Sequence, residues 1–168
     1  MSAPRSVALV VALLSFFTTA VGAQQRGEPA ASPAAAVTAL YTCHLAHDMA
    51  FTLPGVSQRS AWLAPDLLAL CRAYFARPAS PDEVAEIDGD PFTDSQEYPT
   101  RFRLGQVQRA GASALVPVIL SWPGGEIRTV RVHVARIRNA WLVTDVMYES
   151  GESFRKLLAG RQEGALRR

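Results

Sequence analysis

At 168 residues, the chain is long enough for one domain and a targeting segment. Its hydrophobic content of 49% supports a buried core, and its charged content of 19% excludes a disordered acidic or basic tail protein. The formal net charge of +2 gives no general attraction to nucleic acid, so we expect no nucleic-acid partner.

Residues 1–23 have the pattern of a secretory signal peptide. Arg5 supplies the positive start, residues 7–17 form a short apolar run, and residues 21–23 end in small side chains suited to cleavage. The apolar run is too short to cross a hydrocarbon core about 30 Å thick. We therefore expect a periplasmic or secreted protein with no membrane anchor after cleavage, beginning with a flexible leader at residues 24–32.

Three helices are predicted before the middle of the chain. Ser32-Pro33 is typical of an N-cap followed by proline at the first helical position, and apolar residues then recur every three or four positions. We expect this helix to end at Leu53-Pro54-Gly55. A second helix is predicted over Ala64–Ala76, and a capping box at Ser80–Glu83 predicts a short third helix.

Residues Ile87–Pro99 separate these helices from the predicted strands. The segment is rich in Asp, Gly, Pro and Ser, which favour turns over helix or sheet. It also contains Phe92 and Tyr98, two large side chains that a solvated linker does not need. We expect an ordered loop held by these aromatic residues, with its carboxylates capping turns or pairing with arginines of the sheet.

Four strands and a short final helix are predicted after the loop, at residues 100–109, 113–122, 127–137 and 141–148, then 153–158. Pro117 cannot donate to a strand ladder, so it requires a bulge or an unpaired edge. Helices followed by hairpin strands predict an α+β fold, with N-terminal helices packed on a curved four-stranded antiparallel sheet. Residues 33–160 would form this single domain, and residues 161–168 a frayed basic tail.

The two cysteines, Cys43 and Cys71, lie on the first two predicted helices. An even number of cysteines in an oxidising compartment favours a disulfide. A pair of buried thiols is the alternative.

His44 lies in the centre of the apolar face of the first helix, together with Tyr41 and one turn before Asp48. Asp48 could hold the imidazole and raise its basicity, which would suit a general base or a ligand contact in a pocket. The alternative is a structural histidine bonded to Asp48 or to a loop carbonyl. With His47 these residues could approach a metal ion, but a fourth ligand is missing, so we expect no metal. Asp145, within an apolar strand, is a further catalytic candidate.

Three segments together resemble a family of small exported bacterial domains of unknown function: Asp88–Glu97 with its Asp-Gly-Asp-Pro-Phe sequence, Trp141–Tyr148 and Gly151–Leu158. That family is similar in layout to the NTF2-like (cystatin-like) superfamily, in which a helix packs into a curved sheet to form a cone. The resemblance implies such a cone here. Some members, such as ketosteroid isomerases, place catalytic residues in it, whereas many bind ligands or partners without catalysis.

We therefore expect an exported, non-catalytic binding module that recognises a small ligand or an envelope protein and uses no cofactor. One alternative is a small hydrolase or isomerase that uses His44 and Asp48 in the cone. Another is an envelope inhibitor or immunity protein that covers the active site of another protein. The expected binding residues are Tyr41, His44, Asp48, Asp88, Asp90 and Phe92.

Overall fold

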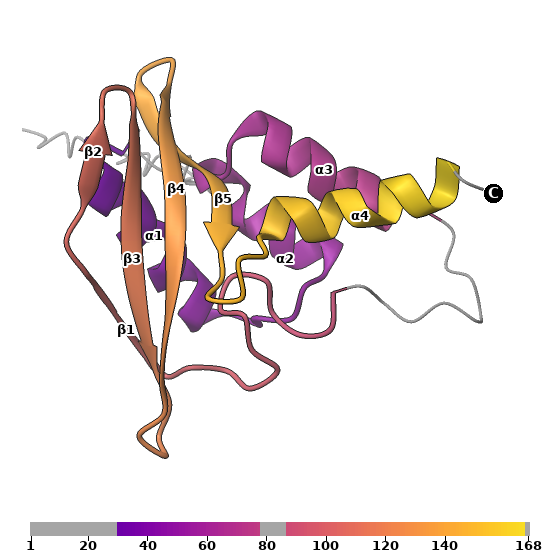
Figure 1. The fold of residues 1–168 in the computed structure, drawn as a ribbon. Helices are drawn as coiled ribbons and strands as arrows, with labels where there is room; N and C mark the ends of the chain where they lie inside the picture. The colour runs from indigo at the N-terminus through magenta and orange to yellow at the C-terminus, as the bar shows by residue number, and fades with distance from the viewer. Residues whose placement is uncertain (1–29, 78–86, 167–168) are drawn as a thin grey trace, which may run out of the picture.

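An antiparallel sheet packed against helices forms the fold, as the computed structural model shows for residues 30–77 and 87–166, with side chains described to residue 160. The predicted signal peptide and the predicted third helix (residues 80–83 onward) lie outside the described residues. The sheet has the order β1-β3-β4-β5, and β2 also pairs with β3. The α+β class is therefore confirmed, with five strands where four were expected (Figure 1). The strands are β1 (Arg101–Leu104), β2 (Gln108–Ala110), β3 (Ser113–Ser121), β4 (Ile127–Ile137) and β5 (Ala140–Met147).

The fifth strand exists because the first predicted strand divides opposite Pro117. The Pro117 carbonyl accepts a 2.8 Å hydrogen bond from Gly105, at the point where β1 ends. The nitrogen and oxygen of one residue point to the same side of an antiparallel strand, so the proline nitrogen also faces this gap between β1 and β2. On this side of β3, Pro117 is paired with no residue of β1 or β2. Of the two expected outcomes, a bulge or an unpaired edge, the unpaired edge is confirmed.

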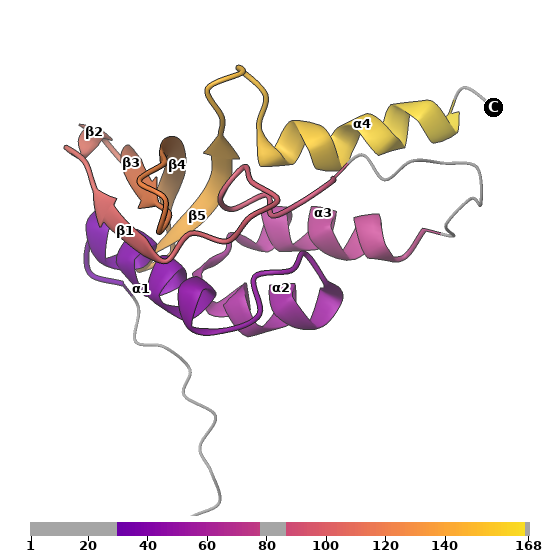
Figure 2. The same cartoon turned by 90° about the horizontal axis from the view of Figure 1, so that it is seen from below.

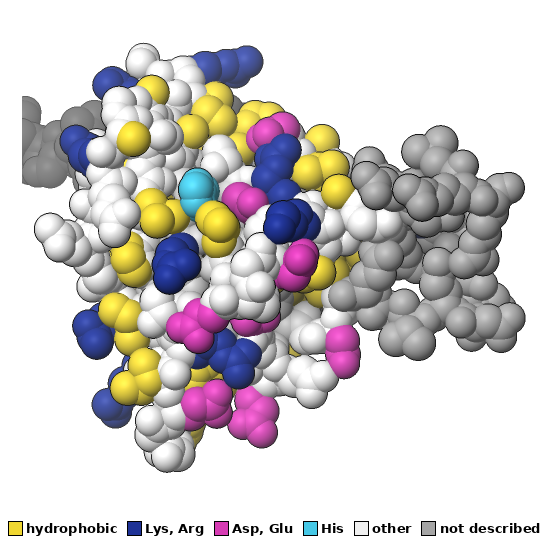
Figure 3. Space-filling view, viewed as in Figure 1, with side chains coloured by type: hydrophobic (Ala, Val, Ile, Leu, Met, Phe, Trp, Pro, Cys, Tyr) yellow, Lys and Arg dark blue, Asp and Glu magenta, His cyan; other side chains and the backbone are white. Residues whose placement is uncertain are grey.

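One face of the sheet is buried against α1 (Pro33–Ala46). Alternate residues in the middle of β3 and β4 are fully buried, including Val116, Val118, Val130 and Val132. Figures 1 and 2 show α1 crossing this face, while no described helix covers the opposite face of β3 and β4. The opposite face is the one seen in Figure 3.

The helices are α1, α2 (Leu53–Arg59), the short 3-10 helix η1 (Ser60–Trp62), α3 (Pro65–Phe75) and α4 (Phe154–Leu166). The expected end of the first helix at residues 53–55 is wrong: α1 ends at Ala46, and Leu53 begins α2. Thr52 accepts from the amide of Gly55 at 3.2 Å, and proline follows in the first turn, so this sequence starts a helix. Helix α4 continues through residues 161–166, which were expected to fray.

The expected disulfide is not formed, because Cys43 and Cys71 are both free thiols. Cys43 is half-exposed and has its sulfur 3.8 Å from Nδ1 of His47, whereas Cys71 is fully buried. Helices α1 and α3 both contact α2 and β5, but α1 packs mainly on the sheet, whereas α3 packs mainly on α4 and α2. Burial raises the pKa of Cys71 to about 12, which keeps it a neutral thiol.

No helix within residues 30–77 and 87–166 combines the length and the hydropathy needed to cross a membrane.

Candidate functional site

Three polar side chains form a hydrogen-bonded cluster in the core, where the 87–99 loop meets α1 and α2. His44, Arg59 and Asp90 are only 0%, 1% and 2% exposed. Arg59 Nε donates to His44 Nδ1 at 2.7 Å, and His44 Nε2 lies 2.6 Å from Asp90 Oδ2. A guanidinium can only donate, so Nδ1 is the acceptor and Nε2 carries the proton. A neutral imidazole therefore bridges a buried cation and a buried carboxylate.

Arg59 is held by all of its donor groups at the end of α2. Nη1 donates to the Gly55 carbonyl and Nη2 to the Asp48 carbonyl, each at 2.6 Å, in addition to the bond to His44. Burial lowers the pKa of Arg59, while the charge of Asp90 acts in the opposite direction. A cation in this position is tolerated because each of its three nitrogens donates a hydrogen bond. Arg59 thus connects α2, the end of α1 and His44.

Asp90 organises the loop around itself. Its carboxylate accepts from the Phe92 amide at 3.0 Å and from the Thr93 hydroxyl at 2.7 Å, besides the bond to His44. Its backbone amide donates to the Ser95 carbonyl at 2.9 Å. Gly89 has φ +112°, and a Cβ there would lie 2.7 Å from the same carbonyl. The turn can therefore close only with glycine at position 89.

Two buried tyrosines fix the backbone of the loop from opposite directions. Tyr41 on α1 donates to the Phe92 carbonyl at 2.6 Å, and Tyr148, just after β5, donates to the Pro91 carbonyl at 2.9 Å. Burial raises the pKa of both phenols. The Phe92 ring packs 5.0 Å from the ring of His44. The expected anchoring by Phe92 is confirmed, but that by Tyr98 is wrong, because Tyr98 is 45% exposed.

The expected pairing of His44 with Asp48 is wrong. The Asp48 side chain is exposed and accepts from the Ala50 amide at 3.0 Å. Helix α1 ends at Ala46, so Asp48 no longer lies one helical turn above His44. Asp48 contributes to the cluster only through the carbonyl that Arg59 contacts.

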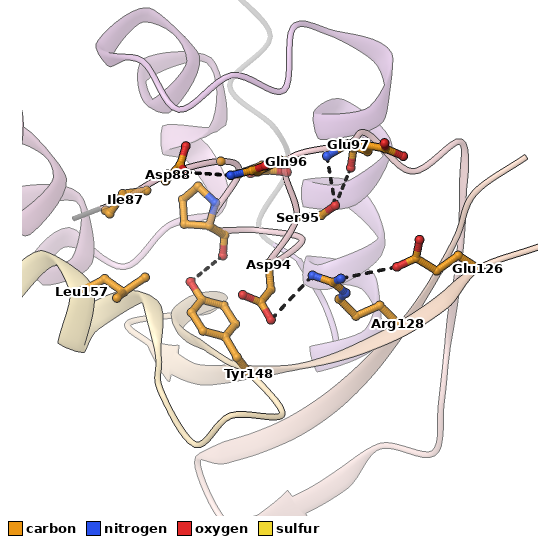
Figure 4. A pocket seen from close by; sticks show the side chains of 13 residues that line it. Ile87, Asp88, Asp94, Ser95, Gln96, Glu97, Glu126, Arg128, Tyr148 and Leu157 are labelled. Atoms are coloured by element: carbon orange, nitrogen blue, oxygen red, sulfur yellow. Dashed lines mark hydrogen bonds and ion pairs between the residues drawn. The ribbon is translucent and has the colours of Figure 1, made fainter. Parts of the chain in front are cut away.

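A pocket of about 510 Å³ opens to solvent beside the loop (Figure 4). The charged residues that line its surface are mostly carboxylates: Asp88, Asp94, Glu97 and Glu126, with Arg128 among them. Arg128 lies 3.9 Å from Asp94 and 3.4 Å from Glu126, which confirms that part of this acidic segment pairs with a sheet arginine. Desolvation raises the pKa of Asp94, while Arg128 acts to lower it. The pocket is therefore acidic overall.

The remaining candidates have local roles. Asp145 Oδ1 accepts from the amides of Val146 at 2.9 Å and Arg155 at 3.0 Å, so it satisfies an amide in the first turn of α4. His47 Nδ1 lies 2.8 Å from the Cys43 carbonyl. In the part of the chain that the structure describes, no group of three His, Cys, Asp or Glu residues is placed to hold a metal ion.

The sequence reasoning missed Arg59, Thr93 and the anchoring role of Tyr148. The Thr52 cap and the following proline could have revealed α2 and placed Arg59 at its end. No local signal shows that the guanidinium turns into the core, because its partner His44 lies 15 residues away and is reached only in the folded chain.

No protein-family model matches the chain, and no curated protein matches it. The solved structures with a similar fold include two of the type VI effector-immunity complex Tae3-Tai3 from Ralstonia pickettii. A chain of the selenomethionine form is 22% identical with a TM-score of 0.50, covering 68% of this chain and 94% of that chain. A chain of the native form is 23% identical with a TM-score of 0.51, covering 69% of this chain and 94% of that chain.

Proposed function

We propose that this protein is a non-catalytic binding protein of the immunity type, which neutralises an effector protein by forming a complex with it. The observation that carries the proposal is the similarity in fold to chains of an effector-immunity complex, which extends over 94% of the matched chain. Of the functions expected from the sequence, this is the envelope inhibitor or immunity protein, whose partner is another protein.

The geometry of the buried cluster supports a non-catalytic role. A general base needs a free lone pair facing a substrate. In His44, Nδ1 already accepts from Arg59, Nε2 already carries a proton directed at Asp90, and the side chain has no exposed surface. The cluster instead holds the loop on α1 and α2, which fixes the shape of the adjacent surface.

The only cysteine–histidine contact among the described residues is likewise not arranged for nucleophilic catalysis. A catalytic thiol needs the nitrogen beside it as a proton acceptor. His47 Nδ1 faces the Cys43 carbonyl at 2.8 Å, an oxygen that can only accept, so this nitrogen carries a proton and cannot take one from the sulfur. Desolvation also raises the pKa of the Cys43 thiol. Cys43 is therefore unsuited to act as a nucleophile.

We further propose that the protein acts in the cell envelope after export. The signal-peptide pattern of residues 1–23 supports this location. An NTF2-like relationship is proposed on the packing of α1 across one face of the antiparallel sheet, the arrangement that the sequence resemblance implies.

The proposal is tested with the proteins encoded on either side of the gene for this chain, as candidate effectors. Cells that express the cognate effector in the periplasm should stop growing, and co-export of this protein should restore growth. Native mass spectrometry of the purified mixture should show a complex of the two proteins. Failure to restore growth, with both proteins present in the envelope, would contradict the proposal, as would a stoichiometric small molecule retained in place of the partner.

A further inference from the structure

The face of the sheet opposite α1 is open over β3 and β4. The outward residues of β3, Leu115, Pro117 and Ile119, are half-buried although no described helix packs over them. They form an apolar stripe along the middle strand. Figure 3 shows this face, with hydrophobic side chains and a histidine over the strands.

The register places positive groups beside this stripe. Arg131 of β4 stands opposite Pro117 on one side and Met147 on the other, and Arg103 of β1 stands opposite Ile119. His133 stands opposite Leu115. Both Arg103 and Arg131 are exposed and form no ion pair within the described residues. The face therefore combines apolar contact area with guanidinium groups that have no internal anion.

Asp145 is the one acidic side chain that the described strands place on this face, and it is already engaged. Its Oδ1 accepts from the amide of Val146 in β5 and from that of Arg155 in the first turn of α4. Four further carboxylates, of Asp88, Asp94, Glu97 and Glu126, belong to the pocket at the loop, and most of the carboxylates in Figure 3 lie in the lower half of the view. Charge is thus divided between a basic sheet face and an acidic loop.

We propose that this open sheet face is the docking surface for the protein partner, and that the partner presents carboxylates around an apolar centre. This inference rests on the proposed function. Such a partner is attracted by Arg103 and Arg131 and repelled by the acidic pocket, which fixes its orientation. A partner of opposite charge would instead be drawn to the pocket, away from the apolar stripe.

The test uses the full mature chain and the effector identified by the growth test described above. In the double variant Arg103→Glu/Arg131→Glu, affinity should fall by at least about 10-fold, mainly through slower association at low salt. The control is Arg72→Glu, which reverses one exposed charge on α3, outside the sheet. This variant should bind like the natural chain. Matching thermal unfolding of all three proteins would show that the fold is kept.

The outcomes separate the two proposals. If the natural chain binds and the double variant binds equally well, the docking surface is elsewhere and this inference is overturned. If the natural chain does not bind the effector, the proposed function fails and the inference with it. If sedimentation shows a dimer of the natural chain that the double variant abolishes, the face binds a second copy, which also overturns the inference.

Discussion

Arg59 Nε donates a 2.7 Å hydrogen bond to His44 Nδ1, and this bond determines the tautomer of the imidazole. Because Nδ1 is an acceptor, the proton lies on Nε2 and points at Asp90, 2.6 Å away. His44 of α1, Arg59 of α2 and Asp90 of the 87–99 loop thus join three separate parts of the sequence.

Replacing His44 should destabilise the protein strongly. His44→Ala leaves Arg59 Nε without a partner in the core and removes one of the two hydrogen bonds that Asp90 Oδ2 accepts. Breaking a buried charged network in this way costs about 3–5 kcal/mol in the free energy of unfolding. Urea unfolding measures the change. His47→Ala, at an exposed position three residues later, is the control and should unfold almost like the natural chain. A similar, small loss in both variants would show that the network contributes little.

The stability of the protein should depend on the shape of the Arg59 guanidinium as well as on its charge. Lysine at this position keeps the charge but cannot bond to His44, Gly55 and Asp48 at the same time. We expect Arg59→Lys to lose about 2–3 kcal/mol of stability. Thermal and urea unfolding should agree on this loss, and a variant as stable as the natural chain would refute the role of the guanidinium shape.

The loop should depend on its two tyrosine anchors. Tyr148→Phe leaves the buried Pro91 carbonyl without its donor, and Tyr41→Phe does the same to the Phe92 carbonyl. Each change should cost about 1–2 kcal/mol. Hydrogen exchange of the loop amides should speed up in both variants. Tyr98→Phe, at an exposed site, serves as the control, and equal exchange in all three variants would contradict the anchoring.

Gly89 and Gly111 make a matched pair for testing the tight turn. Both have positive φ, but a Cβ at Gly89 would meet the Ser95 carbonyl at 2.7 Å, whereas nothing lies within 4 Å of one at Gly111. Gly111→Ala should cost about 1 kcal/mol from its backbone conformation alone. Gly89→Ala should cost about 3 kcal/mol or more, because the clash adds to the strain. Equal losses in urea unfolding would show that the turn can relax.

Asp94 and Asp66 should affect the pH dependence of stability in opposite directions, because the pKa of Asp94 is raised and that of Asp66 is lowered. Desolvation raises the pKa of Asp94, so the folded protein holds this proton to a higher pH than the unfolded chain does, and stability falls as pH rises through that window. Asp94→Asn removes the penalty and also suits the φ of 54° at this position. We expect a gain of about 0.5 kcal/mol or less at neutral pH, because the half-exposed side chain is screened by solvent. The gain should vanish below the usual aspartate pKa of about 3.9.

Asp66 provides the opposite case. Desolvation acts to raise its pKa, but the 2.7 Å hydrogen bond from Arg155 and other contacts outweigh it, so the pKa is lowered. The unfolded chain then binds the proton more tightly, and stability rises with pH through the window. Asp66→Asn should lose stability at neutral pH and match the natural chain in acid. Unfolding measured across the acidic range checks both variants, and identical profiles would contradict both assignments.

The helical period of the sequence was enough to predict that His44 is buried, since it shares a face with Tyr41 and other apolar residues. It could not identify the partner. Helical spacing relates only residues on the same helix, whereas Asp90 lies 46 residues from His44. The predicted partner, Asp48, also lay beyond the end of α1, where the spacing rule no longer holds.

Patterns local in the sequence determined the α+β class, the turn-rich loop and the discontinuity at Pro117, because propensity, alternation and a missing amide act within a few residues. The tertiary structure decided which polar groups meet in the core, that Cys43 and Cys71 stay apart as free thiols, and which sheet face stays open. Each of these depends on how the chain closes loops between distant segments. A buried charge needs a partner wherever the fold brings one, and the sequence alone does not measure that distance.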